Sequence, residues 1–207
     1  MSKVKKESFF WTSYSDLMTS LFFVMLVLFV LVVVLLHNKI SEQALKLEEF
    51  EKIEEIKRSL NNIDSTYFAY NYEYKKHILR IKVEFPTGES DIDMVDQSTL
   101  DKLQEAGLAI QNQINEIAIA NPEIQYLLII EGQASRDNYK HNYELSYARA
   151  LALREFWRKQ GIKFGDNCEV LIAGSGTGGT MREHEERKNQ RFLIHIIPKT
   201  GVIENNN

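Results

Sequence analysis

The sequence predicts a single N-terminal transmembrane helix followed by an α+β domain in which one mixed sheet is covered by two helices. An uncharged run extends from Leu17 to Leu36. It has about 20 residues, the length that a helix needs to cross roughly 30 Å of hydrocarbon. Further along the chain, several short segments alternate apolar and polar residues as strands do, and two longer segments space their apolar residues by threes and fours. Such a mixture is typical of helices packed on one sheet.

Asp16 stands at the N-terminal edge of the apolar run. A helix places residues three and four positions away on the same face. For Asp16 these neighbours all carry a hydroxyl, and they are Thr12, Ser13, Thr19 and Ser20. An acid inserted in a membrane helix costs on the order of 3 kcal/mol and usually has a function. We therefore predict that Asp16 carries a proton or another cation; the alternative is an acid at headgroup level among ordinary helix-start residues.

The residues before the run indicate how the helix is inserted. Three lysines precede three aromatic residues: Lys3, Lys5 and Lys6, then Phe9, Phe10 and Trp11. Basic residues favour the cytoplasmic side of a membrane, and aromatic residues favour the headgroup level. No small-residue cleavage site follows the run, so we expect an uncleaved anchor. Residues 1–8 are then cytoplasmic, residues 9–37 span a bacterial inner membrane, and the remainder is periplasmic.

Residues 38–65 read as an amphipathic helix that serves as a neck or spacer. Their apolar residues are spaced by threes and fours among Glu and Lys, at Ile40, Ala44, Leu47, Phe50, Ile53, Ile56, Leu60 and Ile63. This stripe predicts a seam between two copies of the chain, although the spacing drifts from a strict heptad. The alternative is a helix that packs on its own domain.

The domain is expected over residues 66–198, with the order β-β-α-β-α-β-β. The predicted strands are 68–74, 79–85, 126–130, 169–173 and 192–197. The predicted helices are 97–117, which ends before Asn121-Pro122, and 142–159, which Gly161 follows as a C-cap signal. Residues 199–207 are expected to be a disordered tail.

Composition and motifs argue against several other functions. The net charge is −4 without a basic patch, so nucleic acid is not an expected partner. Gly174 to Gly179 contains G-x-G-x-x-G, but a polar segment follows it in place of an apolar helix, which disfavours nucleotide binding. The five histidines lack metal-ligand spacing, and the single Cys168 has no base partner in the pattern. We expect no enzyme activity, no metal and no cofactor.

The run Trp11-x-x-Tyr14-x-Asp16-x-Met18-Thr19 resembles the start of the B subunits of ion-driven rotary stators, which include MotB of the flagellar motor and ZorB of the Zorya anti-phage system. The resemblance implies that Asp16 carries the ion. It also implies that Thr12, Ser13, Tyr14, Thr19 and Ser20 line the ion path. Two B chains would pair inside a ring of five multi-span A subunits.

Four segments of the domain resemble the OmpA-like peptidoglycan-binding domain. They are Phe85-Pro86-Thr87-Gly88-Glu89-Ser90, Glu131-Gly132-Gln133-Ala134, Asn142-x-x-Leu145-Ser146-x-x-Arg149-Ala150 and Arg187-Lys188-Asn189-Gln190-Arg191. The resemblance assigns Arg149 to the diaminopimelate carboxylate of a peptide stem, with Asn142, Leu145 and Arg191 lining the site. Ser135 stands where the family has Asp. Either Asp137, two residues on, replaces that acid or binding is altered.

Together these features predict the B subunit of an ion-driven stator that is anchored to peptidoglycan. The ZorB-like kind is favoured because Asn38 to Asp64 leaves little room for both a spacer and a plug helix, and because the span ends in an aliphatic Val-Leu tail. The alternatives are a flagellar MotB-like subunit and a passive OmpA-like cell-wall tether. Whether the ion is H+ or Na+ stays open.

Overall fold

The computed structural model describes residues 4–60, 63–86, 88–137 and 139–199. The chain divides into two compact units, Met1–Lys52 and Ile53–Asn207. The predicted tail lies outside the described residues except for Lys199, whose backbone N–H donates to the carbonyl oxygen of Gln125 at 2.8 Å. Thr87 of the first OmpA-like segment also lies outside them.

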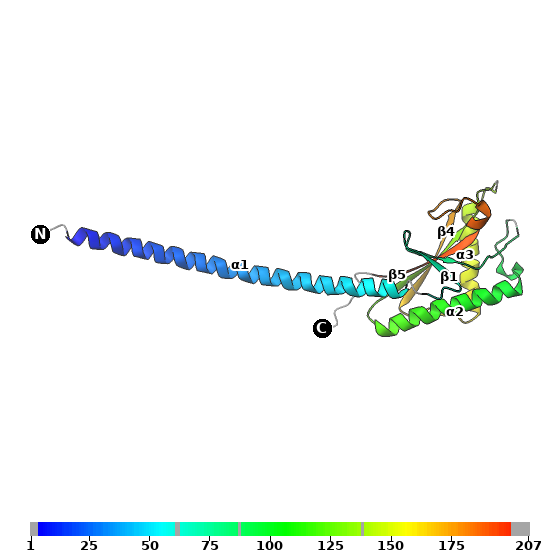
Figure 1. Ribbon diagram of the computed structural model, residues 1–207, viewed down its shortest axis with the longest axis horizontal. Helices are drawn as coiled ribbons and strands as arrows, with labels where there is room; N and C mark the ends of the chain where they lie inside the picture. Colours follow the sequence, from blue (N-terminus) through cyan, green and yellow to red (C-terminus); the bar gives the residue numbers. More distant parts are fainter. Residues whose placement is uncertain (1–3, 61–62, 87, 138, 200–207) are drawn as a thin grey trace. The chain divides into compact units, whose positions relative to one another are not determined.

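The N-terminal unit consists of one helix, α1, which begins at Val4 and continues without a break to Leu60 in the second unit (Figure 1). It joins the predicted span and the predicted neck into a single element. By length and composition, it is the helix among the described residues that is long and apolar enough to cross a membrane. Every residue from Trp11 to Lys52 is exposed.

The predicted neck has two different parts. Ile53, Ile56 and Leu60 are buried within the second compact unit, whereas Ile40 and Phe50 are exposed. The unit therefore begins at Ile53, earlier than the predicted boundary at residue 66, and the alternative of a helix packed on its own domain holds for the last two turns. Spacing alone shows that a helix has an apolar stripe, but it does not show what covers the stripe.

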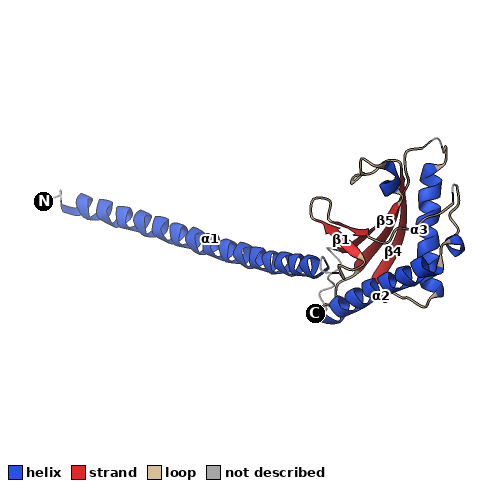
Figure 2. Cartoon of the chain, turned by 45° about the vertical axis from the view of Figure 1, so that its right-hand side comes forward, coloured by secondary structure: helices blue, strands red, loops and turns tan. Residues whose placement is uncertain are grey.

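The domain is built on a five-stranded sheet (Figure 2). Its strands lie in the order β1 (Phe68–Asn71), β2 (Lys76–Leu79), β5 (Arg191–Pro198), β3 (Tyr126–Gln133) and β4 (Cys168–Gly176). Strands β3 and β4 are parallel, and the other neighbours are antiparallel. The predicted mixed sheet and element order are confirmed. The parallel pair needs a crossover connection, which α3 provides.

Helices α2 (Gln97–Ala120) and α3 (Asn142–Lys159) share one apolar core with the sheet. Leu103 of α2, Trp157 of α3 and Leu128 of β3 are all fully buried in it. The Trp157 indole N–H donates to the Leu103 carbonyl oxygen at 2.7 Å, which satisfies a polar group that burial would otherwise penalise. The two covering helices predicted from spacing are therefore confirmed.

Glycines allow α3 to approach the sheet closely. A Cβ atom on Gly132 of β3 would overlap the backbone carbonyl oxygen of Ser146, and one on Gly174 of β4 would lie 2.6 Å from the backbone nitrogen of Tyr147. Gly174 and Gly176 thus belong to a strand beneath a helix. The first two glycines of the G-x-G-x-x-G run therefore serve the packing of α3 on the sheet.

The second predicted strand is wrong in position, since β2 covers residues 76–79 in place of 79–85. The first strand also ends early, at Asn71. Val83 and Phe85 pack on the core without belonging to a strand. Alternation of apolar residues requires only one buried face, and it does not guarantee a hydrogen-bonded neighbour.

Candidate functional site

A pocket of about 130 Å³ lies where residues that follow β3 meet the N-terminal half of α3, with Phe85 and Gly88 also lining it. Four of the five residues predicted to bind peptidoglycan line it, and they are Asp137, Asn142, Leu145 and Arg149. The pattern Asn-x-x-Leu-x-x-x-Arg places its members on one face of a helix. Here that face points into the pocket.

Arg149 supplies a fixed positive charge. Its side chain is only 5% exposed, and its Nε donates to the Glu89 carbonyl oxygen at 2.9 Å. Its Nη2 lies 3.4 Å from the Pro86 carbonyl oxygen, and the guanidinium carbon lies 4.7 Å from the centre of the Phe85 ring. Burial lowers the pKa of Arg149, while the nearby Asp137 opposes that shift. A guanidinium nevertheless stays charged at neutral pH.

Asp137 supplies a negative charge at the exposed rim. Its Oδ1 accepts from the Asn142 side-chain amide at 2.8 Å and from the Tyr139 backbone N–H at 3.0 Å. The hydrogen bond from Asn142 lowers the pKa of Asp137, burial opposes that shift, and weaker contributions from the Tyr139 and Ser135 bonds add to the lowering. Asp137 is therefore ionised at neutral pH.

Ser135, which stands where the OmpA-like resemblance predicted an Asp, contacts Asp137. Its Oγ lies 3.4 Å from the Asp137 Oδ2 and accepts from the Gln190 side-chain amide at 2.8 Å. The loop after β3 thus still places a carboxylate, that of Asp137, near the end of the strand, although Ser135 carries a hydroxyl where an Asp was expected.

Arg191 does not line this pocket. Its Nε donates to the Gln133 Oε1 at 3.0 Å, and its Nη1 pairs with Glu183 at 3.3 Å. It shares with Arg149 only a narrow adjoining cavity of about 10 Å³. These bonds connect β5 to β3 and to the loop that precedes β5, so the geometry gives Arg191 a structural role.

Six residues that line the pocket were not among the predicted binding residues, and they are Phe85, Gly88, Ala134, Ser135, Tyr139 and Gln190. Gln190 lies within the Arg187 to Arg191 segment. That motif therefore contains a residue of the pocket, but the residue is Gln190 and not the predicted Arg191. Tyr139 belongs to the loop before α3 and follows no periodic pattern. The Tyr139 backbone N–H donates to the Asp137 Oδ1.

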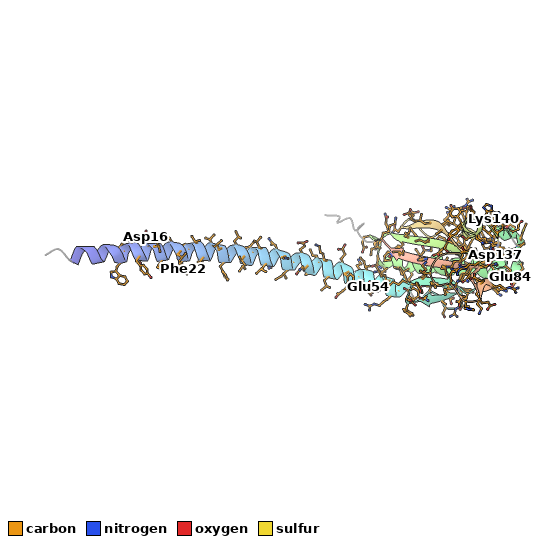
Figure 3. The ribbon with its side chains drawn as sticks, turned by 90° about the horizontal axis from the view of Figure 1, so that it is seen from above. Asp16, Phe22, Glu54, Glu84, Asp137 and Lys140 are labelled. Atoms are coloured by element: carbon orange, nitrogen blue, oxygen red, sulfur yellow. The ribbon has the colours of Figure 1, made fainter. Side chains whose placement is uncertain are left out.

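On α1, Asp16 and its hydroxyl neighbours are exposed; Figure 3 labels Asp16 on this helix and Asp137 in the domain. Thr19 donates to the Ser15 carbonyl oxygen at 2.7 Å, and Ser20 donates to the Asp16 carbonyl oxygen at 2.8 Å. A hydroxyl that donates in this way keeps lone pairs that can accept. The rings of Trp11 and Tyr14 meet edge to face at 6.3 Å.

Other chemistries find little support in the described part of the chain. No group of three or more His, Cys, Asp or Glu side chains there could hold a metal ion. Burial raises the pKa of Cys168 to about 11, which disfavours the reactive thiolate.

No model of a protein family matches the chain, and no curated protein matches it in sequence. Solved structures with a similar fold include a putative MotB-like protein from Desulfovibrio vulgaris, at 13% identity with a TM-score of 0.49, covering 73% of this chain and 96% of that one. An outer membrane protein from Borrelia burgdorferi B31 is 21% identical with a TM-score of 0.42, over 63% and 95% of the two chains. The C-terminal domain of Helicobacter pylori MotB is 14% identical with a TM-score of 0.41, over 59% and 88%.

Proposed function

We propose that this chain is a membrane-anchored protein that binds peptidoglycan through the pocket of Arg149 and Asp137. The observation that carries the proposal is a buried guanidinium and a rim carboxylate facing one small pocket. Diaminopimelate in a peptide stem carries an amino group and a carboxylate on the same carbon. The guanidinium complements the carboxylate in a forked hydrogen bond, and Asp137 complements the ammonium.

We further propose that the chain is the B subunit of an ion-driven stator, in which Asp16 carries H+ or Na+. The support is an acid among hydroxyls at the edge of an apolar helix, which a plain anchor does not need. Two copies would pair within a ring of five multi-span A subunits, with the N-terminus in the cytoplasm and the domain in the periplasm. Ion flow would supply about 2.3 kcal/mol per charge per 100 mV.

Between the two stator kinds, the short connection supports the Zorya type. Only residues 37–52 separate the apolar run from the compact domain that begins at Ile53. That is less room than the sequence suggested, and it disfavours a plug helix beside a spacer. A flagellar stator subunit and a passive wall tether are the competing functions.

The test compares Asp16→Asn with wild type in cells that carry the gene and its native neighbours. The substitution keeps the side-chain shape and removes the titrating charge. The control is Glu42→Gln, which removes an exposed acid from the same helix outside the apolar run. We expect wild type and Glu42→Gln to reduce phage plating, and Asp16→Asn to lose at least tenfold of that protection at equal membrane levels.

Equal protection by wild type and Asp16→Asn would refute the ion-carrier role and favour the tether. If no strain protects, the same variants are scored for swimming, where loss of motility in Asp16→Asn alone would identify the flagellar type. Binding of the full chain to purified sacculi should stay unchanged in Asp16→Asn, so the two proposals fail separately.

A further inference from the structure

A second pocket lies in the same domain at a notch in the sheet. Strand β2 pairs with β5 only through His77 with Ile194 and Ile78 with Leu193, whereas β5 continues to Pro198. Residues of the β1–β2 turn line one side of the pocket beside this stretch of β5, and residues of the last turns of α1 line another. The resulting pocket has a volume of about 300 Å³ and shares no lining residue with the pocket of Arg149.

The floor and walls of this pocket are aromatic and apolar. The ring centroids of Tyr70 and His77 lie 4.8 Å apart. The other aromatic and apolar lining residues are Tyr74, Ile196, Ile197 and Pro198. His77 is only 3% exposed. Burial lowers the pKa of His77 to about 4, although the Leu60 and Ile194 carbonyls oppose the shift. The floor is therefore neutral at physiological pH.

The charges around the pocket leave an excess of cations. Lys57 is paired with Glu54 at 2.7 Å. Arg58 and Lys75 also line the pocket, and neither forms an ion pair with another described residue. The hydrogen bond from Lys57 is the main cause that lowers the pKa of Glu54. The charges of Lys75 and Arg58 lower it further.

The acid nearest the rear wall is balanced by its own partners. The Glu131 Oε2 lies 3.0 Å from the Nε2 of His195, which lines the pocket, and 2.9 Å from the Nζ of Lys76. Glu73 bonds to the Tyr74 side chain and adds one negative charge beside the pocket. Because Glu54 and Glu131 are held in ion pairs, Arg58 and Lys75 together leave an excess of positive charge for a ligand.

We propose that this pocket binds a small organic anion with a planar apolar body. Its acid group would lie between Arg58 and Lys75, and its body would pack against Tyr70 and Tyr74. The volume falls in the range of small-molecule sites, which combine apolar walls with a few polar groups. A peptide stem is hydrophilic and zwitterionic, so it suits the pocket of Arg149 and not this one.

Such a ligand would bridge elements that are distant in sequence. Arg58 lies in the last turn of α1, and Lys75 lies in the turn between β1 and β2. Binding would therefore hold residues 53–60 against the domain and reduce their local opening. Binding can therefore be followed by slower amide hydrogen exchange of the backbone as well as by the affinity for the ligand.

The test titrates 1-naphthoate into the full-length protein in lipid nanodiscs, with empty nanodiscs subtracted. We expect a Kd on the order of 0.1 mM, as suits a ligand of this size. The neutral analogue 1-naphthalenemethanol, which keeps the ring system, should bind at least tenfold more weakly. Inorganic phosphate alone should also bind at least tenfold more weakly, because it has no apolar body.

The double variant Arg58→Gln with Lys75→Gln should weaken 1-naphthoate binding by roughly tenfold or more. Lys102→Gln, a substitution of an exposed lysine on α2, is the matched control and should leave binding unchanged. In wild type, 1-naphthoate should slow amide hydrogen exchange in residues 53–60 and 70–77.

Several results would overturn the proposal. They are no binding of 1-naphthoate, equal binding of the neutral analogue or of phosphate, and equal affinity in the double variant. Slowed exchange only around Arg149 would place the anion in the other pocket and would also overturn it. Sacculus binding by the double variant should match wild type, which separates this site from the proposed wall-binding function.

Discussion

The two acids to which we assign functions lie in regions that differ in what surrounds them. Asp16 belongs to a helix whose residues are all exposed from Trp11 to Lys52, so its nearest polar groups are those of its own helix. Asp137 accepts bonds from Asn142 and Tyr139 and faces a pocket that it shares with Arg149. The domain thus builds a complete charge arrangement within one chain. The helix supplies one face of a site, which on our proposal other membrane helices complete.

The substitution with the largest expected effect tests whether the domain depends on close packing between α3 and the sheet, which the membrane-spanning part of α1 does not need. Gly132→Ala would drive a Cβ atom into the Ser146 carbonyl oxygen, where α3 meets β3. We expect a loss of about 3 kcal/mol or more in the free energy of unfolding of the domain, with membrane insertion unaffected. Urea unfolding followed by tryptophan fluorescence would measure it.

The matched control for that experiment is Gly161→Ala. No heavy atom lies within 4 Å of its added Cβ, but its φ of +76° makes a side chain cost about 1 kcal/mol. Equal destabilisation by both substitutions would show that close packing at Gly132 is not what limits the domain.

The next effect concerns pH, which should act on the domain through two buried groups. Burial raises the pKa of Glu131, but bonds from His195 and Lys76 outweigh it and bring the value to about 2. The pKa of His77 is lowered to about 4 by burial. An unfolded chain binds protons at both groups before the folded chain does, so stability falls with falling pH.

For His77 the loss runs from about pH 6.5 down to 4, and for Glu131 from about pH 4.5 down to 2, each amounting to about 3 kcal/mol. Denaturant midpoints at a series of pH values would show both steps. His77→Phe should remove the upper step and Glu131→Gln the lower one. If the step between about pH 6.5 and 4 persists in His77→Phe, another group causes it.

The smallest expected effect tests the charge that completes the domain pocket. Asp137→Asn keeps an oxygen that can accept from Tyr139 and removes the negative charge, so we expect about tenfold weaker binding to sacculi with little change in stability. Asp101→Asn, at an exposed acid on α2 bonded to Gln97, is the control. Unchanged binding of Asp137→Asn would mean that the rim carboxylate does not contact the ligand.

The sequence alone determined the features that local patterns encode. The apolar run specified a helix of membrane-spanning length, and spacing by threes and fours placed α3 at the bounds that the structure has, Asn142–Lys159. Because the members of a helical motif keep their spacing in any context, Asn142, Leu145 and Arg149 could be assigned to one face before the fold was known.

Tertiary structure decided what depends on contacts between distant parts of the chain. Arg149 is fixed by the carbonyl of Glu89, 60 residues away, and Gln190 reaches Ser135, 55 residues away. The same holds for the burial of Ile53 to Leu60, for the short pairing of β2 and for the notch beside β5. A stripe or an alternation shows which side of an element is apolar, but only the packed fold shows which partner covers it.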